Sequence, residues 1–400
     1  MTCSRSGWWP ALLAVVLGCA LALALAEIAL RVLGISYPML NATDPCCGPV
    51  LRPGAAGWWT AEGNAYVAIN SDGLRDDEHA RAKDPQRFRI AVIGDSYAEA
   101  KQVPLEQTFF RVAARELERC AALPAAGVEP INFGVSGYST AQELRMYESR
   151  ARDYAPDLVL LAFHTANDVS DNSKALDAHA MRPYFELRDG ELVLDDSFVR
   201  GEQFVRRQTL AWKIAAAVTS RSRLAQLANE FHVRRKQAAR REKEQAKAAV
   251  AGDELGTSHG IYLDPPPREW EDAWQITDAI LGRFAQEVAS DGAELFVAVL
   301  SNGIQVNPDA AAREAFAQQL AVPDLDYPDR RLTAILDRRG IAHVVLTPPL
   351  REQAERSGEC LHGFENAEPC SGHWNAAGHR AGGTLIADAL CRRFAAKSIQ

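Results

Sequence analysis

Ser96 is the residue with the clearest potential for covalent chemistry. It follows Gly94 and Asp95 at the end of the apolar run 88–93, a pattern that predicts a buried strand ending in a turn. In open α/β sheets, ligands bind at the carboxyl ends of the strands, so a serine at this position is a candidate nucleophile. The alternative is that Ser96 lies at a strand–helix junction and merely caps a helix. The residues around Ser96 do not decide between these two roles.

Three later segments offer partners for a nucleophilic serine. After the second predicted strand, 131–133, the chain turns at Gly137, which has no Cβ to block its main-chain N–H from a reacting oxygen. The third predicted strand, 158–163, is followed by the side-chain amide of Asn167. Near the C-terminus, His373 opens the last predicted helix. All of these lie at strand ends or turns, and we expect them to meet at one edge of the sheet.

Strands and helices alternate along the chain, which predicts a parallel, doubly wound sheet. The expected fold is α/β and flavodoxin-like, with three α/β/α layers and a five-stranded parallel sheet. The expected strands are 88–93, 131–133, 158–163, 294–300 and 341–346, and the expected helices are 106–121, 140–154, 268–290, 327–339 and 376–396. Between the third and fourth strands, residues 173–265 are expected to form an insertion, with a hairpin over 184–194 and helices over 205–250.

In this order, the segments resemble the sequence blocks of SGNH hydrolases, also called GDSL esterases and lipases. The resemblance covers residues 87–172 and 266–396. The matching segments are Gly94-Asp95-Ser96 for the nucleophile block, Asn132 to Gly137 for the glycine block, Asn167-Asp168 for the asparagine block and His373 to His379 for the histidine block. No G-x-S-x-G motif surrounds Ser96, which separates the chain from α/β-hydrolases with a nucleophile elbow.

The resemblance implies covalent serine catalysis without a metal or a cofactor. Ser96 would attack a carbonyl carbon, and His373 would accept the proton of the serine. The main-chain N–H groups of Ser96 and Gly137, with the Asn167 side chain, would hold the oxyanion. Other residues of the blocks are expected to support the site: Asp95 and Asp168, with Trp374 shielding or shaping the pocket, His164 near the rim and His379 packing in the final helix.

The chain departs from the family pattern at two positions. Thr165 stands where the third block usually has glycine, a change that is expected to be tolerated. Cys370 stands where the family has the aspartate that orients the histidine. Glu368 and Glu365 are the nearest carboxylates upstream of His373. The hypothesis is therefore a Ser–His dyad whose imidazole is oriented by Glu368 or by a backbone carbonyl.

The N-terminal residues predict export. Residues 8–26 form an unbroken apolar stretch of about the minimum length that spans a bilayer, and it starts with two tryptophans typical of a membrane interface. The alternative is a cleaved signal peptide, because Ala24-Leu25-Ala26 has the form of a cleavage site. An uncleaved anchor over 1–34 is favoured because apolar sequence continues past Ala26. A membrane-proximal lead-in over 35–85 and a hydrolase domain over 86–400 would then lie on the periplasmic or extracellular side.

The chain has eight cysteines, and two of them, Cys3 and Cys19, lie in the targeting segment. Cys360 and Cys370 close a short loop and are the first disulfide candidate. Cys120 and Cys391 lie on helices that would share one face of a flavodoxin-like sheet, so they are the second. The pairing of the adjacent cysteines 46 and 47 is open, and free buried cysteines are the alternative. No pair has the spacing of a zinc site.

Charge narrows the choice of partners. A net charge of −8 argues against nucleic-acid binding, which needs a basic face. A basic stretch over 234–247 could contact anionic lipid or an acidic envelope glycan, although such a run is more often a solvated helix face. The expected activity is hydrolysis of acyl esters, with O-acetyl groups of an envelope polysaccharide as possible substrates. The alternatives are an O-acyltransferase that uses the same site, and an inactive glycan-binding or scaffold module favoured by the missing aspartate.

Overall fold

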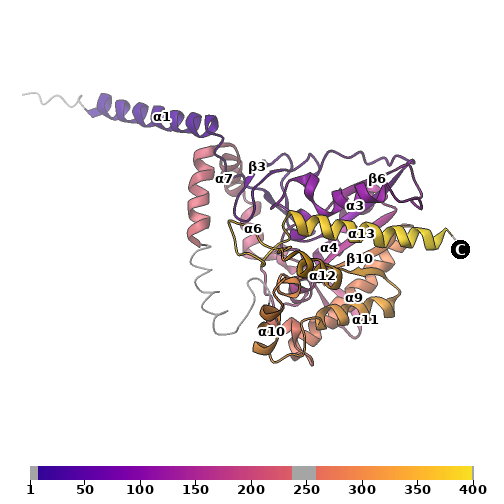
Figure 1. The fold of residues 1–400 in the computed structure, drawn as a ribbon. Helices are drawn as coiled ribbons and strands as arrows, with labels where there is room; N and C mark the ends of the chain where they lie inside the picture. Colours follow the sequence, from indigo (N-terminus) through magenta and orange to yellow (C-terminus); the bar gives the residue numbers. More distant parts are fainter. Residues whose placement is uncertain (1–7, 237–257, 399–400) are drawn as a thin grey trace, which may run out of the picture.

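The computed structural model describes residues 8–236 and 258–398 and has a parallel sheet at its centre (Figure 1). The five strands are β5 (Arg87–Gly94), β6 (Gly127–Asn132), β7 (Leu158–His164), β10 (Glu294–Leu300) and β11 (Ala342–Val345). Their order across the sheet is β11-β10-β7-β5-β6, and every neighbouring pair is parallel. Numbered along the chain, this is the 2-1-3-4-5 order of flavodoxin-like folds. The predicted fold class is confirmed.

The central strands are apolar on both faces, as a sheet covered by helices on both sides requires. Along β7, Val159 and Leu161 belong to one hydrophobic core, whereas Leu158 and Leu160 belong to the other. The same alternation with a period of two residues continues in β5 and β10. The sheet therefore separates two cores, and each core is completed by helices.

Helices cover both faces of this sheet (Figure 1). The helices of the first face are α3 (Phe109–Leu117), α12 (Thr347–Ser357) and α13 (Ala376–Lys397), and those of the second are α4 (Thr140–Ser149), α9 (Arg268–Ser290) and α11 (Tyr327–Arg339). The helix expected over 106–121 is shorter than predicted, because Thr108 has an extended backbone that separates the 3₁₀ turn Leu105–Gln107 from α3. The expected helix 140–154 is likewise divided into α4 and a 3₁₀ turn over Ala151–Tyr154. Helices α10 (Ala310–Gln319) and α12 were not predicted.

The strand order reverses between β5 and β7, and two one-turn helices follow these strands. They are α2 (Ser96–Glu99), after β5, and α5 (Thr165–Asp168), after β7. Such a switch point is where open α/β sheets bind ligands. The topology therefore brings the residues after β5 and β7 to one crevice.

The lead-in forms two hairpins. They pair β1 (Asn41–Asp44) with β2 (Gly48–Leu51), and β3 (Ala56–Trp59) with β4 (Ala65–Ala68). Leu51 and Val67 are buried in the same core as α4 and α9. The lead-in is thus packed against the sheet unit, and its β3–β4 turn lies over residues 60–64.

The insertion contains the predicted hairpin, formed by β8 (Tyr184–Arg188) and β9 (Glu191–Asp195). Two helices follow, α6 (Glu202–Gln208) and α7 (Leu210–Arg221), and residues 223–236 are also helical. From residue 237, the predicted basic stretch lies outside the described residues.

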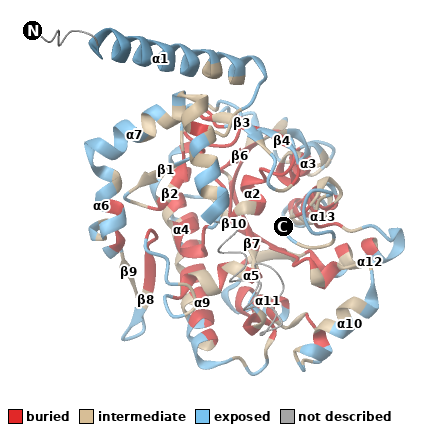
Figure 2. Cartoon of the chain, turned by 90° about the vertical axis from the view of Figure 1, so that its left-hand side faces the viewer, coloured by how far each residue is buried: buried red, intermediate tan, exposed pale blue. Residues whose placement is uncertain are grey.

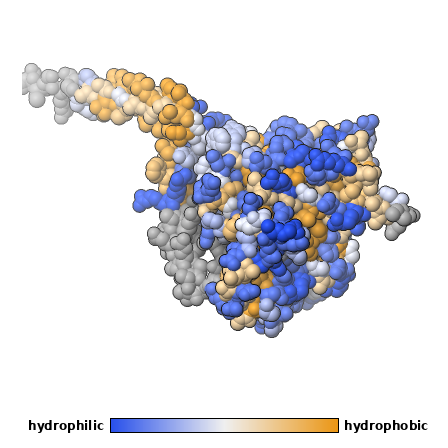
Figure 3. All heavy atoms as spheres, in the orientation of Figure 1, coloured by the Kyte–Doolittle hydropathy of each residue, from blue (hydrophilic) through white to orange (hydrophobic). Residues whose placement is uncertain are grey.

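Helix α1 (Trp8–Val32) has no buried residue and projects from the rest of the chain (Figures 1 and 3). Among the described residues, it is one helix long and apolar enough to cross a membrane. A signal sequence has the same properties, so α1 fits either an anchor or a signal sequence.

Both predicted cysteine pairs are disulfide-bonded, Cys120 with Cys391 and Cys360 with Cys370. The first joins the end of the α3 segment to α13, with Cα atoms 5.8 Å apart. Close contact between these helices depends on Gly383, because a Cβ there would lie 2.5 Å from the carbonyl oxygen of Phe109. The adjacent Cys46 and Cys47 are not disulfide-bonded, and their sulfur atoms lie 2.9 Å apart.

Removing the Cys120–Cys391 disulfide is expected to destabilise the oxidised protein. The bond spans 271 residues, so a Cys120→Ser, Cys391→Ser chain should lose about 2–4 kcal/mol of unfolding free energy, chiefly through a less constrained unfolded state. Urea unfolding of both chains measures this difference. The matched Cys360→Ser, Cys370→Ser chain opens a loop spanning only 10 residues and should lose less. A reversed order of the two losses would contradict this account.

Candidate active site

Ser96 and His373 lie against each other, although 277 residues separate them in sequence. Ser96 is the first residue of α2, at the carboxyl end of β5, and His373 precedes α13. The Ser96 Oγ and the His373 Nε2 are 2.8 Å apart, which is hydrogen-bond distance. Both residues are partly exposed, so a substrate can reach the hydroxyl. The hydroxyl can therefore donate its proton to the imidazole.

A carboxylate completes the arrangement, and it comes from the lead-in. Glu62, in the turn between β3 and β4, places Oε2 2.5 Å from the His373 Nδ1. Its Oε1 accepts a hydrogen bond from the main-chain N–H of His373 at 2.9 Å. The three side chains form a hydrogen-bonded series of carboxylate, imidazole and hydroxyl, which is a geometry that serine chemistry can use. Glu62 therefore holds the ring in the tautomer that leaves Nε2 free to accept the serine proton.

The hypothesis that Glu368 orients the imidazole is not what the structure shows. Glu368 and Glu365 are exposed on the loop before His373, whereas Glu62 occupies the Nδ1 side of the ring. Cys370, at the position of the family's aspartate, has φ of 59° and is disulfide-bonded to Cys360. The orienting carboxylate is thus supplied by a different segment from the one predicted.

The position of Glu62 depends on contacts between its turn and the loop before His373. The Asn366 side chain accepts a hydrogen bond from the Gly63 N–H and donates to the Thr60 and Gly63 carbonyls. Gly372 has φ of +76°, and a Cβ there would lie 2.7 Å from the Glu62 Oε1. A glycine at 372 is therefore needed both for the backbone turn and for room beside the carboxylate.

The Glu62 carboxylate is stabilised in its charged form. Partial burial raises its pKa, but hydrogen bonds from the ring and main chain of His373 outweigh that effect, and the net result is a lowered pKa. The Gln102 side chain donates a further hydrogen bond at 3.3 Å. Glu62 thus stays ionised at neutral pH, as the stabilisation of an imidazolium requires.

Two main-chain N–H groups at the ends of neighbouring strands could bind an oxyanion, those of Ser96 after β5 and Gly137 after β6. Gly137 is exposed, has φ of +77°, and has open space where a Cβ would be. Among the described residues, neither its N–H nor that of Ser96 has a hydrogen-bond partner. The preceding Ser136 N–H donates to the Glu99 carboxylate at 2.6 Å, which fixes the turn that carries Gly137.

The Asn167 side chain is oriented by a histidine. The His164 Nδ1 lies 2.7 Å from the Asn167 Oδ1, and the Asn167 Nδ2 lies 3.3 Å from the Tyr138 carbonyl oxygen. Burial lowers the pKa of His164, so its ring is neutral at physiological pH and can donate its one proton to Asn167. The amide NH₂ is then directed away from His164, toward the turn that carries Gly137.

The expected supporting residues lie next to the site. Asp95 caps α2 by accepting a hydrogen bond from the Tyr97 N–H at 2.8 Å. Asp168 accepts one from the His164 N–H at 2.7 Å, and burial raises its pKa well above the ordinary range. Trp374 is fully buried and packs on Tyr97, the residue after Ser96. His379 stacks on Phe109 in the core, as expected.

A second serine–histidine pair was not predicted. His362 places Nε2 3.0 Å from the Ser301 Oγ and Nδ1 2.7 Å from the Gly372 carbonyl oxygen. Both side chains are buried, and desolvation lowers the pKa of His362 to about 3. The Tyr97 hydroxyl also donates to the Gly372 carbonyl, at 3.0 Å. This pair is closed to substrate and fixes the loop that leads into His373.

One group among the described residues has the donor atoms for a metal ion. The ligand atoms of Asp44, Cys46 and Cys47 lie within 4.8 Å of one another, at the β1–β2 hairpin. None of the three is a candidate catalytic residue.

No family model matches the sequence, and no curated protein matches it. Solved structures with partial similarity include LAE5, an alpha/beta hydrolase enzyme from the metagenome of Lake Arreo in Spain, with 12% identity over 77% of this chain and 95% of that chain and a TM-score of 0.37. The acetyl xylan esterase AlAXEase has 10% identity over 76% and 98%, with a TM-score of 0.37. Axe2, an acetylxylan esterase from Geobacillus stearothermophilus, has 12% identity over 77% and 94%, with a TM-score of 0.35. Similarities this low carry no argument about the function of this chain.

Replacing Glu62 tests the carboxylate. Glu62→Gln keeps the size of the side chain but removes its charge and favours the wrong tautomer of His373. By analogy with serine proteases, in which the corresponding change costs about 10⁴ in kcat, we expect a loss of roughly 10²–10⁴ in ester hydrolysis. Glu368→Gln is the matched control and should retain wild-type rates. Equal rates for Glu62→Gln and the wild type would show that Glu62 has no role in the reaction.

Asn167→Ala tests the side-chain donor of the oxyanion hole. Loss of one such donor typically costs about 10²–10³ in kcat, and KM should change little because the bond forms mainly in the transition state. Steady-state kinetics with a small acyl ester would show whether kcat falls while KM stays nearly the same. Ser170→Ala is a suitable control, since its hydroxyl lies near the same helix and contacts main-chain carbonyls of residues 166 and 167. A loss confined to KM would contradict an oxyanion role.

Proposed function

We propose that this chain is a serine ester hydrolase of the SGNH type, with Ser96 as nucleophile, His373 as general base and Glu62 as the orienting acid. The observation that carries the proposal is the continuous hydrogen-bonded series from Glu62 through His373 to Ser96, with distances of 2.5 and 2.8 Å. Gly137 and Asn167 support it, because they follow β6 and β7, the strands on either side of β5, and offer N–H donors at the same edge of the sheet as Ser96.

In the proposed reaction, the Ser96 Oγ forms a bond to the ester carbonyl carbon while its proton passes to the His373 Nε2. The oxyanion accepts hydrogen bonds from the main-chain N–H groups of Ser96 and Gly137 and from the Asn167 amide. His373 then protonates the leaving alcohol, which leaves an acyl-serine. Water attacks the acyl-serine with His373 again as base, and the carboxylic acid and free serine are released.

We further propose that α1 anchors the chain in a membrane, with the rest on the exported side. Support comes from the apolar, unburied surface of α1 and from the two disulfides, which persist in oxidising compartments. An enzyme in that position would meet acyl esters of the envelope, and O-acetyl groups of envelope polysaccharides are the proposed substrate class.

The inactive-module alternative rested on the missing aspartate, and Glu62 now occupies the corresponding place beside the ring. Labelling with a fluorophosphonate probe distinguishes an active serine hydrolase from an inactive module. We expect one covalent adduct on Ser96, none on Ser96→Ala, and hydrolysis of p-nitrophenyl acetate that follows the labelling. No adduct on folded wild-type protein, or an adduct that persists in Ser96→Ala, would refute the hydrolase. Added glycan that accelerates release of the acyl group and itself becomes acylated would show a transferase.

A further inference from the structure

A large groove lies between the lead-in and the helices of the insertion. Its volume is about 1450 Å³, and we call it the anchor-side groove because Arg31 of α1 lines it. The described residues that line it include basic side chains but no aspartate or glutamate. The basic residues are Arg31, Arg52, Lys101, Arg207, Lys213, Arg221 and Arg223. This purely basic set of charged lining residues contrasts with the chain as a whole, whose net charge is −8.

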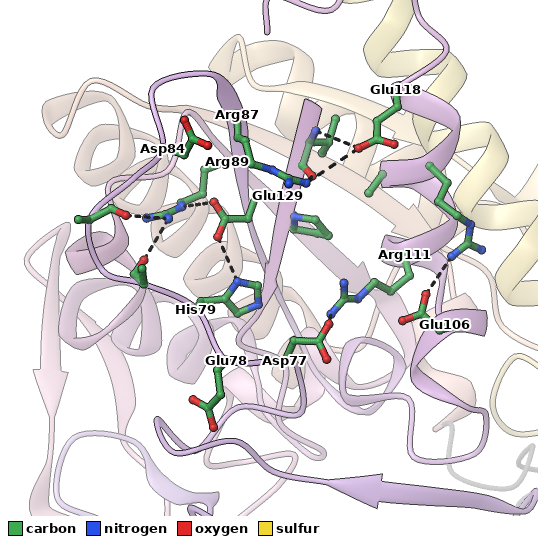
Figure 4. A pocket seen from close by; sticks show the side chains of 16 residues that line it. Asp77, Glu78, His79, Asp84, Arg87, Arg89, Glu106, Arg111, Glu118 and Glu129 are labelled. Carbon is green, nitrogen blue, oxygen red and sulfur yellow. Dashed lines mark hydrogen bonds and ion pairs between the residues drawn. The ribbon is translucent and has the colours of Figure 1, made fainter. Parts of the chain in front are cut away.

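Most of these cations have no carboxylate partner among the residues that the structure describes. Within the described ranges 8–236 and 258–398, an ion pair within 4.0 Å is found for only two of the groove's basic residues, Arg31 with Glu27 and Lys101 with Glu99. The contrast is a smaller pocket beside the amino-terminal ends of β5 and β6 (Figure 4). There the charges neutralise one another, as in the Arg89–Glu129 pair.

The pKa values of two arginines in the groove are lowered, as expected for buried cations near other cations. Burial and the nearby Arg221 lower the pKa of Arg52, and burial and Arg206 lower that of Arg207. The Arg207 Nε is also buried without a hydrogen-bond partner. An anion in the groove would relieve both the repulsion and the missing hydrogen bond.

The outer wall of the groove is α7, and it exposes an apolar stripe. Leu210, Ile214 and Val218 are 72, 55 and 56% exposed, and their spacing of four residues places them on one side of the helix. Trp212 and Lys213 of the same helix line the groove. An exposed apolar stripe beside basic residues is the pattern of helices that lie in a membrane interface.

The end of α1 is fixed to this surface. The Glu27 carboxylate accepts hydrogen bonds from the main-chain N–H groups of Arg223 and Leu224, at 2.9 and 3.0 Å, and so caps the helical segment 223–236. Arg31 donates to the carbonyl of Arg221 at 2.7 Å. Figures 1 and 2 both show α7 next to the end of α1, on the side from which α1 projects, and Figure 2 shows α7 as largely exposed.

We infer that the anchor-side groove and the α7 stripe together bind the anionic phospholipids of the membrane that α1 enters, with headgroup phosphates among the basic side chains of the groove and the stripe against the acyl chains. The inference rests on the proposed membrane location of α1. A lipid fits better than a soluble polyanion because the apolar stripe borders the cations and α1 ends at the same place. Trp59 and Tyr66, which line the groove, belong to the hairpin that carries Glu62. The bound lipid would therefore contact the element that supplies the catalytic acid.

Lipid retention tests the cationic part of the site. The full chain would be placed in nanodiscs of phosphatidylcholine with 30% phosphatidylglycerol, and the lipids retained after release would be counted by native mass spectrometry. Wild-type protein should retain phosphatidylglycerol selectively over phosphatidylcholine. In the Arg52→Gln, Lys213→Gln, Arg221→Gln chain, the ratio of the two retained lipids should fall by about tenfold or more. A matched chain with Arg119→Gln, Arg338→Gln and Arg356→Gln has the same change in net charge and should behave as wild type. Equal losses in both chains, or equal retention of the neutral lipid, would overturn the proposal.

Two further measurements separate the possible failures. An environment-sensitive fluorescent residue at position 214 should be quenched by spin-labelled lipid, whereas one at the exposed position 187 of the β8–β9 hairpin should not. Quenching at neither position, or binding of polygalacturonate in detergent as tight as that of phosphatidylglycerol, would overturn the lipid assignment. Ser96→Ala should retain the lipid, so failure of the hydrolase proposal and failure of this one give different results.

Discussion

The hydrogen bond between Glu62 and His373 is the interaction on which the proposed site depends. It joins residues 311 positions apart and gives a partly buried carboxylate the partner that burial demands. Without Glu62 the imidazole would lose its oriented tautomer, and without His373 the carboxylate would be desolvated with little compensation. The packing of the β3–β4 hairpin against the loop before α13 therefore sets the geometry of the base.

The lead-in also positions the nucleophile. The buried Arg75 donates to the carbonyl oxygens of Glu99 and Ala100, at 2.5 and 2.6 Å, just after the one-turn helix that begins with Ser96. Asn132 donates to the Ala98 carbonyl at 2.9 Å and accepts from the Gly134 N–H at 2.9 Å. These bonds tie α2 to both the lead-in and the glycine turn. Arg75 and Asn132 thus hold the segment that begins with Ser96 between the lead-in and the turn that carries Gly137.

Much of the fold could be predicted because it depends on local patterns. Alternating apolar runs such as 158–163 mark strands that are buried on both faces, and the ordered blocks around Ser96 and His373 placed both residues at the same edge. Glu62 could not be found this way, because it lies in a short turn with little periodicity, 34 residues before the nucleophile. Its one sequence signal is a carboxylate beside Gly63, between two short runs that pair as β3 and β4. Glu368 was predicted because it is close to His373 in sequence, but the carboxylate that contacts the ring comes from Glu62, 311 residues away.

The place of the acid in the sequence has a consequence for biosynthesis. Ribosomes complete the chain from its N-terminus, so the hairpin with Glu62 and the strand with Ser96 are made long before His373. Until His373 has emerged and α13 has docked on α3, Ser96 lacks the imidazole with which it is hydrogen-bonded in the folded protein. A chain released before that point would carry Ser96 and Glu62 without His373, so the proposed hydrolysis would begin only after the loop before α13 has folded.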